Sequence, residues 1–394
     1  MRTAGLSGGV RIVGTGLMGA SIGLALRRAG VPVTLADISP TARALARDLG
    51  AGTLTTAQAP ANQPALVVVA IPPDVTARVV AAELRAWPEA TVTDVASVKS
   101  AILHELTGHL EPGHPSSSAA AVAGAEPIHL PPMTLEHRAR YVGSHPMAGR
   151  ERSGAIAAKA DLFEGRPWVI TPHPDSAPTS VALVEELARQ VGAVVTLMDA
   201  DEHDEAVAAV SHVPQVAASL VAARLRDLPT RSVGLAGSGL RDVIRIAASD
   251  PAMWTAILTG NATAVSQVLR DLMTDLAGVI DALTALEEPS HNDIGAREVL
   301  ARLVSNGNAG YARIPGKHGA SPTTYAVVTV VIPDTPGSLG RLLVTVGEEG
   351  VNLEDLHLEH NLGKLTGIVE ISVVPAAADP LRAALRTRGW TVQD

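Results

Sequence analysis

Residues 10–26 read VRIVGTGLMGASIGLAL, and this stretch decides the fold class. The apolar run Val10–Val13 leads into the spacing Gly14-x-Gly16-x-x-Gly19, and an Ala- and Leu-rich helical stretch follows. A glycine-rich turn between a strand and a helix is the pattern that binds the phosphates of a dinucleotide. Gly14 permits the tight turn, Gly16 lets the backbone approach the phosphates, and Gly19 lets the helix pack closely on the strand.

The cofactor is expected to be NAD, because an acidic residue stands where the adenosine ribose would lie. Asp37 follows the second predicted strand, and a carboxylate there accepts hydrogen bonds from the ribose 2′-hydroxyl and repels a 2′-phosphate. The alternative is that Asp37 only caps the next helix, in competition with Ser39.

Two further segments are expected to contribute to the cofactor site. The helix that starts at Leu17 and Met18 presents free N–H groups and the positive end of its dipole to the phosphates. Ile71 and Pro72 end the third predicted strand and are expected to form the floor of the site, with a plain turn as the alternative.

The composition indicates a large globular protein. The chain has 394 residues, of which 46% are apolar and only 2% aromatic, so its cores must consist mainly of Ala, Val, Leu and Ile. The net charge is −9 and no long basic run occurs, which argues against nucleic acid or an anionic membrane as a partner. The absence of cysteine excludes disulfides, thiolate metal sites and a cysteine nucleophile. The longest apolar run, 65–71, is too short to span a bilayer, and we expect a cytoplasmic location.

Periodicity divides the chain into three blocks. Residues 8–175 alternate short β-branched runs with Ala-rich stretches, which predicts a Rossmann-type α/β domain whose parallel sheet is covered on both faces. A Pro-, Ser- and Ala-rich surface insertion interrupts this block at 111–132. The expected strands are Val10–Val13, Val33–Ala36, Leu66–Ile71, Thr91–Val95, Tyr141–Gly143 and Trp168–Thr171.

The second block, residues 176–312, is predicted to be all-helical. One helix is expected over Asp199–Asp227, with a kink at Pro214, and another over Pro251–Leu286. The latter spans about 36 residues, which is longer than most globular helices. Such a helix often buries one face against another subunit, so we expect a homodimer; the alternative is a bundle within one chain.

The third block, residues 325–394, follows the Gly- and Pro-rich stretch 305–323, and a linker is expected at 313–324. The order strand, helix, strand, strand, helix, strand predicts a small ferredoxin-like module. Its expected strands are Tyr325–Ile332, Leu353–His360, Gly367–Val374 and Thr391–Gln393, and its expected helices are Gly337–Glu349 and Pro380–Arg388.

Polar segments follow two more predicted strands, at the sheet edge where an open α/β fold binds ligands. Ser97 lies after the fourth strand, and His145 lies in the Gly-bounded segment 143–149 after the next. An imidazole there can take a proton from a substrate hydroxyl while hydride leaves the same carbon. His145 is therefore the candidate base, and an ordinary loop histidine is the alternative.

Five motifs over residues 10–300 occur in the order of a known family: GTGLMGASIGLAL, TDVASVK, GSHPMAGRERSG, SHVPQ and GSGLRDVIRIAASDPAMWTAILTGN. Through them the sequence resembles the prephenate/arogenate dehydrogenases of tyrosine biosynthesis. The segment PDTPGSL at 333–339 resembles an ACT domain, a module that commonly binds amino acids. The expected architecture is thus a Rossmann-type domain, an all-α dimerisation domain and an ACT-like domain.

The resemblance implies the oxidative decarboxylation of prephenate to 4-hydroxyphenylpyruvate, with hydride transfer to NAD. It places the catalytic base at His145, a hydroxyl-orienting serine at Ser97 and a carboxylate-binding arginine at Arg245. It also places pocket-lining or gating residues at three positions, which are Glu151, Arg241 and Trp254.

The charge of the substrate agrees with these assignments. A dianion in a recessed site requires guanidinium groups, and Arg241 and Arg245 stand four residues apart, so one helix face would present both. Surface ion pairs are the alternative. No metal is expected, because the acids near His203 and His212 are interpreted as a helix start beside a family motif.

The family pattern SHxPH reads Ser211-His212-Val213-Pro214-Gln215 here. In that family the position of Gln215 is near the substrate side chain, and the lack of charge on glutamine leaves the choice between prephenate and arogenate open. His212 is assigned to the substrate site, with packing at the kink as the alternative. An arogenate or dual-substrate cyclohexadienyl dehydrogenase is the second functional candidate, and a non-catalytic amino-acid sensor is a remote third. An amino-acid effector is expected at the ACT-like domain, whose alternative role is purely structural.

Overall fold

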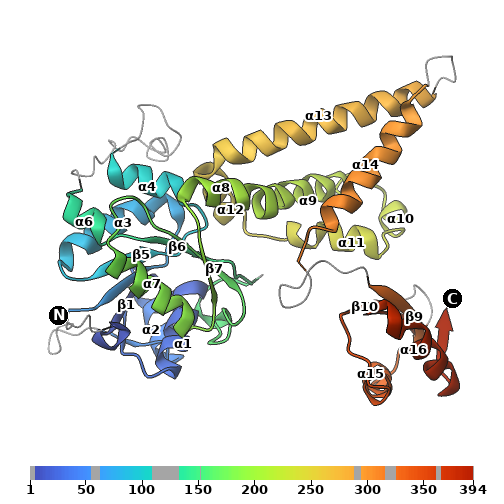
Figure 1. Cartoon of the computed structure of the whole chain (residues 1–394), viewed down its shortest axis with the longest axis horizontal. Coiled ribbons are helices and arrows are strands. Elements are labelled where there is room, and N and C mark those ends of the chain that lie inside the picture. The colour runs from blue at the N-terminus through green and yellow to red at the C-terminus, as the bar shows by residue number, and fades with distance from the viewer. Residues whose placement is uncertain are drawn as a thin grey trace. The chain divides into compact units, whose positions relative to one another are not determined.

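The computed structural model describes residues 5–54, 63–108, 133–150, 152–287, 294–315, 325–360 and 365–393 (Figure 1). The chain divides into two compact units, Met1–Leu272 and Met273–Asp394. The predicted insertion at 111–132, the candidate Glu151 and the linker residues 316–324 lie outside the described residues.

A five-stranded sheet organises the first unit. Its strands run in the order β3-β2-β1-β4-β5, and every neighbouring pair is parallel. The order reverses beside β1, which creates the switch point where an open α/β sheet binds ligands. The strands are β1 (Val10–Val13), β2 (Val33–Ala36), β3 (Thr53–Leu54), β4 (Leu66–Val69) and β5 (Thr91–Asp94).

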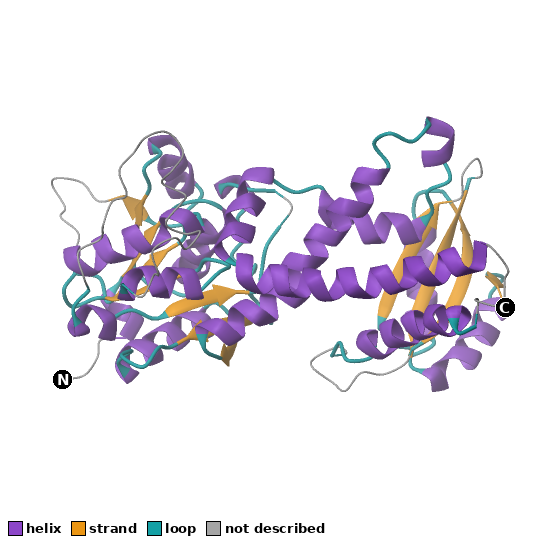
Figure 2. Ribbon diagram, turned by 90° about the horizontal axis from the view of Figure 1, so that it is seen from above, coloured by secondary structure: helices purple, strands orange, loops and turns teal. Residues whose placement is uncertain are grey.

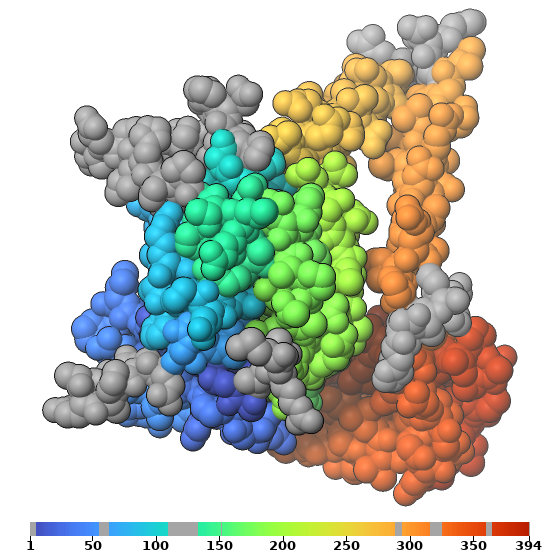
Figure 3. Space-filling view, turned by 60° about the vertical axis from the view of Figure 1, so that its left-hand side comes forward, coloured from blue at the N-terminus to red at the C-terminus, as the bar shows by residue number. Residues whose placement is uncertain are grey.

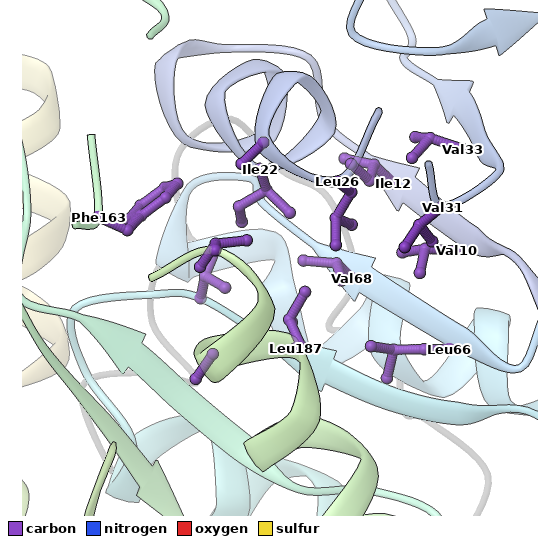
Figure 4. Close-up of a cluster of buried hydrophobic side chains, with 14 of the residues drawn as sticks. Val10, Ile12, Ile22, Leu26, Val31, Val33, Leu66, Val68, Phe163 and Leu187 are labelled. Carbon is purple, nitrogen blue, oxygen red and sulfur yellow. The ribbon is translucent and has the colours of Figure 1, made fainter. Parts of the chain in front are cut away.

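Helices cover both faces of this sheet, as predicted. Leu66 and Val68 of β4 belong to a core shared with α1 and α7, where Ile22, Leu26 and Leu187 surround them (Figure 4). The alternate β4 residues face a second core that includes side chains of α3 and α4. A strand buried on both faces must be apolar throughout, which explains the sequence LVVV. The helices are α1 (Leu17–Arg28), α2 (Pro40–Asp48), α3 (Pro73–Ala86), α4 (Ser100–Thr107), α6 (Leu135–Ala139) and α7 (Pro178–Gln190).

A second, three-stranded sheet consists of β6 (Gly143–Pro146), β7 (Pro167–Thr171) and β8 (Val194–Leu197). β6 is antiparallel to β7, and β7 is parallel to β8. The strand predicted at Tyr141–Gly143 begins at Gly143 instead, because Tyr141 makes only an isolated bridge to Val92 at the edge of the first sheet. His145 therefore lies in a strand and not in a loop. In Figure 3 the green segment 152–197 lies against the light-blue segment 63–108.

The first long helical stretch is interrupted at the predicted proline. It comprises α8 (Ala200–Val207), a π-helical turn η4 (Ala208–His212) and α9 (Val213–Arg224). Pro214 has no N–H and its ring crowds the preceding turn, so the wider π turn accommodates it where a kink was expected. Among the described residues, one helical stretch, 200–224, is long and apolar enough to cross a membrane. Its buried residues, including Ala200, Val207 and Val213, are those of a core helix.

The helix predicted at Pro251–Leu286 is broken into α12 (Pro251–Gly260) and α13 (Ala262–Glu287). Asn261 interrupts it with φ −124° and ψ 33°, and its side chain is used inside the protein. α14 (Ala296–Tyr311) continues through 305–311, which was expected to be irregular. Along α13 several apolar side chains are exposed, namely Leu272, Met273, Leu276, Ile280 and Leu283. The remaining short helices are η1 (Gly5–Gly8), η3 (Ala155–Ala157), α10 (Thr230–Val233), α11 (Ser238–Ile244) and η5 (Arg245–Ala247).

The C-terminal block has the predicted ferredoxin-like topology. Its sheet has the order β10-β11-β9-β12 with antiparallel neighbours, and both helices contribute to the core on one sheet face (Figure 2). The second helix begins at Pro375, whereas Pro380 was expected as its start. Either proline can occupy a first helical turn, so the sequence alone did not distinguish the two starts. The elements are β9 (Ala326–Pro333), α15 (Ser338–Glu348), β10 (Asp355–His360), β11 (Thr366–Val373), α16 (Pro375–Thr387) and β12 (Thr391–Gln393).

Candidate functional site

The glycine-rich turn after β1 has no room for side chains where it folds back on the sheet. Gly14 has φ +95°, and a Cβ there would lie 2.2 Å from the carbonyl oxygen of Ala70. A Cβ at Gly19 would lie 1.9 Å from the carbonyl oxygen of Gly14. A Cβ at Gly16 would meet nothing within 4 Å, so the backbone there borders open space in the described structure. This arrangement fits a dinucleotide diphosphate at the N-terminus of α1, where Leu17 and Met18 are the first residues.

One close contact of α1 was missed by the sequence analysis. A Cβ at Gly23 would lie 2.3 Å from the carbonyl oxygen of Ala51. The spacing Gly19-xxx-Gly23, which places two small residues on one helix face, was the available signal.

Asp37 ties the glycine-rich turn to the end of β2. Its Oδ2 accepts hydrogen bonds from Thr15 N at 2.7 Å and Thr15 Oγ1 at 2.8 Å, and its Oδ1 accepts one from Ser39 N at 2.8 Å. The N-cap of α2 is Ser39, whose side chain accepts a hydrogen bond from Ala42 N. A carboxylate has about four acceptor positions, so Asp37 retains acceptor capacity for a ribose hydroxyl.

The segment after β4 borders the same turn. The Cγ2 atom of Ile71 lies 2.7 Å from the position that a Cβ of Gly14 would take. Pro72 is the N-cap residue of α3, and its carbonyl oxygen accepts a hydrogen bond from Thr76 Oγ1 at 2.9 Å. Both candidates thus lie where the chain leaves the sheet next to the glycine-rich turn.

His145 is the end of a hydrogen-bonded chain of three side chains. Its Nδ1 lies 2.9 Å from Nε2 of His203, and Nδ1 of His203 lies 2.7 Å from Oδ1 of Asp204. Among the described residues, none hydrogen bonds to Nε2 of His145. Burial is the main cause that lowers the pKa of His145 well below its ordinary value, and the positive charge of Lys99 lowers it further.

Asp204 is itself held from two sides. Its Oδ1 and Oδ2 accept hydrogen bonds from the backbone N–H groups of Lys99 and Ser100, each at 2.9 Å, at the N-terminus of α4. Its carbonyl oxygen accepts one from Nδ2 of Asn261 at 2.7 Å. Nδ2 of Asn261 also lies 3.2 Å from Nδ1 of His212, so the break between α12 and α13 supplies a group that joins α8 to η4.

A buried ion pair contacts the backbone of the residue that precedes His145. Lys99 Nζ contacts Asp94 Oδ1 and donates to the carbonyl oxygen of Ser144 at 2.8 Å, while Tyr141 donates its hydroxyl to Asp94 Oδ2 at 2.8 Å. Burial lowers the pKa of Lys99 and raises that of Tyr141 well above its usual value. The sequence analysis missed this role, although Lys99 is one of only four lysines in an Arg-rich chain. Ser97 is half-buried two residues before Lys99, and its side chain has no hydrogen-bond partner among the described residues.

The candidates on the helical stretch are also placed near one another. His212 is buried at the end of η4, and its ring meets the edge of the Trp254 ring with centroids 6.1 Å apart. Burial lowers the pKa of His212 to about 4. Gln215 is buried one turn further on, where its Oε1 accepts a hydrogen bond from Ser249 Oγ at 3.5 Å.

An arginine-lined hollow of about 460 Å³ follows β6. Its lining residues are Gly149, Arg150, Arg152 and Arg245. Arg150 and Arg152 were missed, although the sequence GRERSG contains both. Arg241 is exposed on α11 and does not line the hollow. The α-helix ends at Ile244 and Arg245 begins the 3₁₀ turn η5, so the two arginines do not lie on one continuous α-helix.

Within the described ranges, no three or more histidine and acidic side chains are grouped as they would be around a metal ion. The histidines instead contact one another and Asn261 through ring nitrogens.

Comparisons with known proteins show the family of the chain. Family models for the nucleotide-binding domain and the dimerization domain of prephenate dehydrogenase match residues 22–128 with 125–197 and residues 199–293, respectively. The probable prephenate dehydrogenase NovF of Streptomyces niveus is 34% identical over 381 residues, which are 96% of this chain and 98% of that protein. The chain belongs to the prephenate dehydrogenase family. It is therefore an NAD-dependent oxidoreductase.

Other members of the family are similar over shorter ranges. The cyclohexadienyl dehydrogenase of Zymomonas mobilis is 28% identical over 285 residues, 70% of this chain and 88% of that protein. The crystal structure of prephenate dehydrogenase from A. aeolicus, in complex with hydroxyphenyl propionate and NAD+, is 26% identical with a TM-score of 0.59. That similarity covers 77% of this chain and 97% of the other. The names of these relatives include more than one substrate.

Proposed function

We propose that this prephenate dehydrogenase family member oxidises and decarboxylates prephenate to 4-hydroxyphenylpyruvate. One observation carries the proposal: His145, whose Nε2 has no hydrogen-bond partner among the described residues, is followed within a few residues by Gly149 and Arg150 of the arginine-lined hollow. An imidazole can accept the proton of the substrate hydroxyl, and guanidinium groups can bind the carboxylates of a dianion.

We assign the chemistry of the family to the side chains as follows. Bound NAD+ would supply the acceptor for the hydride from C4 of the ring, and the glycine-rich turn after β1 would hold it. Nε2 of His145 takes the proton of the C4 hydroxyl, which Ser97 orients. The electrons of the bond to the ring carboxylate then move into the ring as CO2 leaves, and protonated His145 returns its proton to the new phenolate oxygen. Arg245 holds a substrate carboxylate, and Arg241, Glu151, His212, Gln215 and Trp254 are the remaining substrate-site candidates.

Prephenate is favoured over arogenate by the charge of the hollow. Prephenate carries two carboxylates, whereas arogenate also carries an ammonium group. Arg150, Arg152 and Arg245 line the hollow, and guanidinium groups suit a substrate with two carboxylates and no ammonium group. The dual-substrate alternative keeps support from the similarity to the cyclohexadienyl dehydrogenase.

Parallel assays with prephenate and arogenate test this choice. We expect kcat/KM for prephenate to exceed that for arogenate by about tenfold or more, which corresponds to about 1.4 kcal/mol of selective binding. Equal values would establish dual use, and a preference for arogenate would refute the charge argument. If neither substrate yields NADH, the non-catalytic sensor becomes the better interpretation.

Asp37 is proposed to favour NAD over NADP, because a 2′-phosphate would meet its carboxylate. Ile71 and Pro72 are proposed to border the same cofactor. Steady-state kinetics with both cofactors test the role of Asp37. We expect Asp37→Ser to reduce the NAD preference, and a wild-type enzyme that prefers NADP would contradict the assignment.

The exposed apolar stripe of α13 is proposed to form a homodimer interface. The support is the exposure of Leu276 and Ile280 on a helix that the dimerization-domain family covers. Light scattering after size-exclusion chromatography is expected to give a dimer for the wild type and a monomer for Leu276→Glu with Ile280→Glu. A wild-type monomer would refute the interface.

The C-terminal module is proposed to bind an amino-acid effector, as an ACT domain does. A hollow of about 120 Å³ at the start of α15 supports this, with Asp334, Thr335 and Ser338 among its lining residues. Calorimetry with tyrosine, phenylalanine and tryptophan tests it, and an absence of binding would leave a purely structural module.

The proposed functional division is a cofactor domain at 8–175, which α7 and β8 complete, a substrate and dimerisation domain over the rest of 176–312, a linker at 313–324 and an effector domain at 325–394. Limited proteolysis tests it, and cleavage only inside these domains would count against it. We also propose a cytoplasmic location, which cell fractionation tests; recovery in the membrane fraction would contradict it.

A further inference from the structure

We propose that His203 and Asp204 are positioning residues that fix which ring nitrogen of His145 carries the proton. The pair holds His145 with hydrogen on Nδ1 and a lone pair on Nε2, before any substrate binds. This inference rests on the proposed function only for the role of His145 as the base.

The proton positions follow from the order of donors and acceptors. The Asp204 carboxylate can only accept, so Nδ1 of His203 must carry hydrogen across their 2.7 Å contact. In a neutral imidazole the other nitrogen is then an acceptor, so Nε2 of His203 faces His145 with a lone pair. Nδ1 of His145, 2.9 Å away, must donate, which leaves its Nε2 unprotonated. That is the form a general base requires.

The side chains of Asp204 and His203 cannot easily turn to exchange donors and acceptors, because separate contacts hold each of them. Asp204 would lose the two backbone hydrogen bonds from the start of α4 if its carboxylate turned away. The His203 ring is fully buried and stands at 72° to the ring of His145, with centroids 5.1 Å apart. Asp199 caps α8 by accepting a hydrogen bond from Glu202 N at 2.7 Å, which fixes the first turn that carries His203.

The reverse order of donors and acceptors would place the proton of His145 on its other ring nitrogen. If His203 were an imidazolium, its Nε2–H would donate to Nδ1 of His145, and the proton of a neutral His145 would then lie on Nε2. The tautomer of His145 therefore decides between the two arrangements.

Nitrogen NMR of the wild-type enzyme with bound NAD measures this tautomer directly. With ¹⁵N-labelled histidine, the His145 signals are identified by their loss in His145→Asn. We expect a protonated Nδ1 and an unprotonated Nε2, and a proton on Nε2 would overturn the proposal. No substrate is needed, so a wrong assignment of the substrate leaves this result unaffected.

Two variants of His203 separate positioning from packing. His203→Leu removes the acceptor, and we expect the His145 proton to move to Nε2 and kcat to fall about 10²–10⁴-fold, as for a wrong tautomer elsewhere. KM and NAD affinity should change little. His203→Gln restores an acceptor oxygen, and we expect it to recover at least about tenfold of the lost kcat.

His173→Leu is the matched control, since His173 is also a buried histidine of the first unit but has no contact with His145 among the described residues. It should leave kcat and the His145 tautomer unchanged. Wild-type kcat in His203→Leu, or equal losses in the Leu and Gln variants, would refute the positioning role. If His203→Leu fails to fold, the wild-type tautomer still decides.

Discussion

The ammonium group of Lys99 and the carboxylate of Asp94 form an ion pair that solvent scarcely reaches, with exposures of 1% and 0%. Asp94 ends β5, and Lys99 also binds the carbonyl oxygen of Ser144 in β6. The pair therefore joins the two sheets directly beside His145. The same strand is also attached through Ser144, whose Oγ donates to the carbonyl oxygen of Asp94 at 2.9 Å.

Lys99→Met tests how strongly this pair holds the fold. The substitution leaves a buried charge on Asp94 without its partner, and we expect a loss of about 3–5 kcal/mol in the free energy of unfolding. Urea denaturation measures the change. Lys159→Met, at a lysine outside this pair, should stay within about 0.5 kcal/mol of the wild type. Similar losses of unfolding free energy in both variants would show that the effect is not specific to this ion pair.

His145→Asn tests the proposed base. Asparagine cannot take up the hydroxyl proton, so we expect turnover to fall about 10²–10⁴-fold. NAD affinity, measured by calorimetry, should be retained because the glycine-rich turn is unchanged. Near-normal turnover would remove His145 from its role.

Arg245→Ala tests carboxylate binding, with Arg241→Ala as its control. Loss of a charged hydrogen bond costs about 1.5–3 kcal/mol, so we expect KM for prephenate to rise about 10–100-fold in the Arg245 variant. Arg241 lies outside the hollow, and its removal should raise KM far less. An unchanged KM for Arg245→Ala, or equal effects of the two variants, would contradict the assignment.

The pH dependence of kcat/KM follows from the lowered pKa of His145. The base works in its neutral form, and burial together with the positive charge of Lys99 favours that form. Activity should therefore persist as the pH falls below 6.5, the ordinary histidine value, and decline only at lower pH. A pH profile at saturating NAD checks this, and an acidic limb centred at or above pH 6.5 would be inconsistent with the site.

His212 predicts a matching effect on stability. Its pKa is about 4 in the folded protein, against the ordinary histidine value of 6.5 in the unfolded chain. As the pH falls, the unfolded chain therefore binds a proton at this histidine before the folded protein does, which favours unfolding. The stabilisation is fully present above pH 6.5 and is lost as the pH falls from 6.5 to about 4. Unfolding titrations of the wild type and His212→Gln should show a smaller pH dependence in the variant. Parallel pH curves would contradict this prediction.

The elements that local sequence determines were predicted well. β1 and β2 have the predicted bounds, because each is a short apolar strand followed by a turn that glycine or an acidic residue defines. The ferredoxin-like order of the last block was also predicted, because alternating strands and helices leave few topologies. ACT-type binding in that block stays a prediction.

Features that depend on contacts between distant residues were missed. Asn261 breaks a helix whose own residues favour continuity, because its amide bonds to the backbone of Asp204, far away in the sequence. In the sequence, His203 was interpreted as part of an acidic helix start. Only the folded chain brings its ring next to the ring of His145. Lys99 likewise has no local pattern that predicts complete burial, since its partners end one strand and begin another.

The single wide turn η4 has a geometric consequence. In an unbroken α-helix, His203 and His212 would be about half a turn out of phase and would face opposite sides. One extra residue per turn rotates everything downstream, which lets both imidazoles face the same interior. Deleting one residue between 208 and 211 would restore a regular helix at the expense of this alignment. The enzyme thus uses an irregularity in its backbone, and not an additional loop, to assemble its histidines.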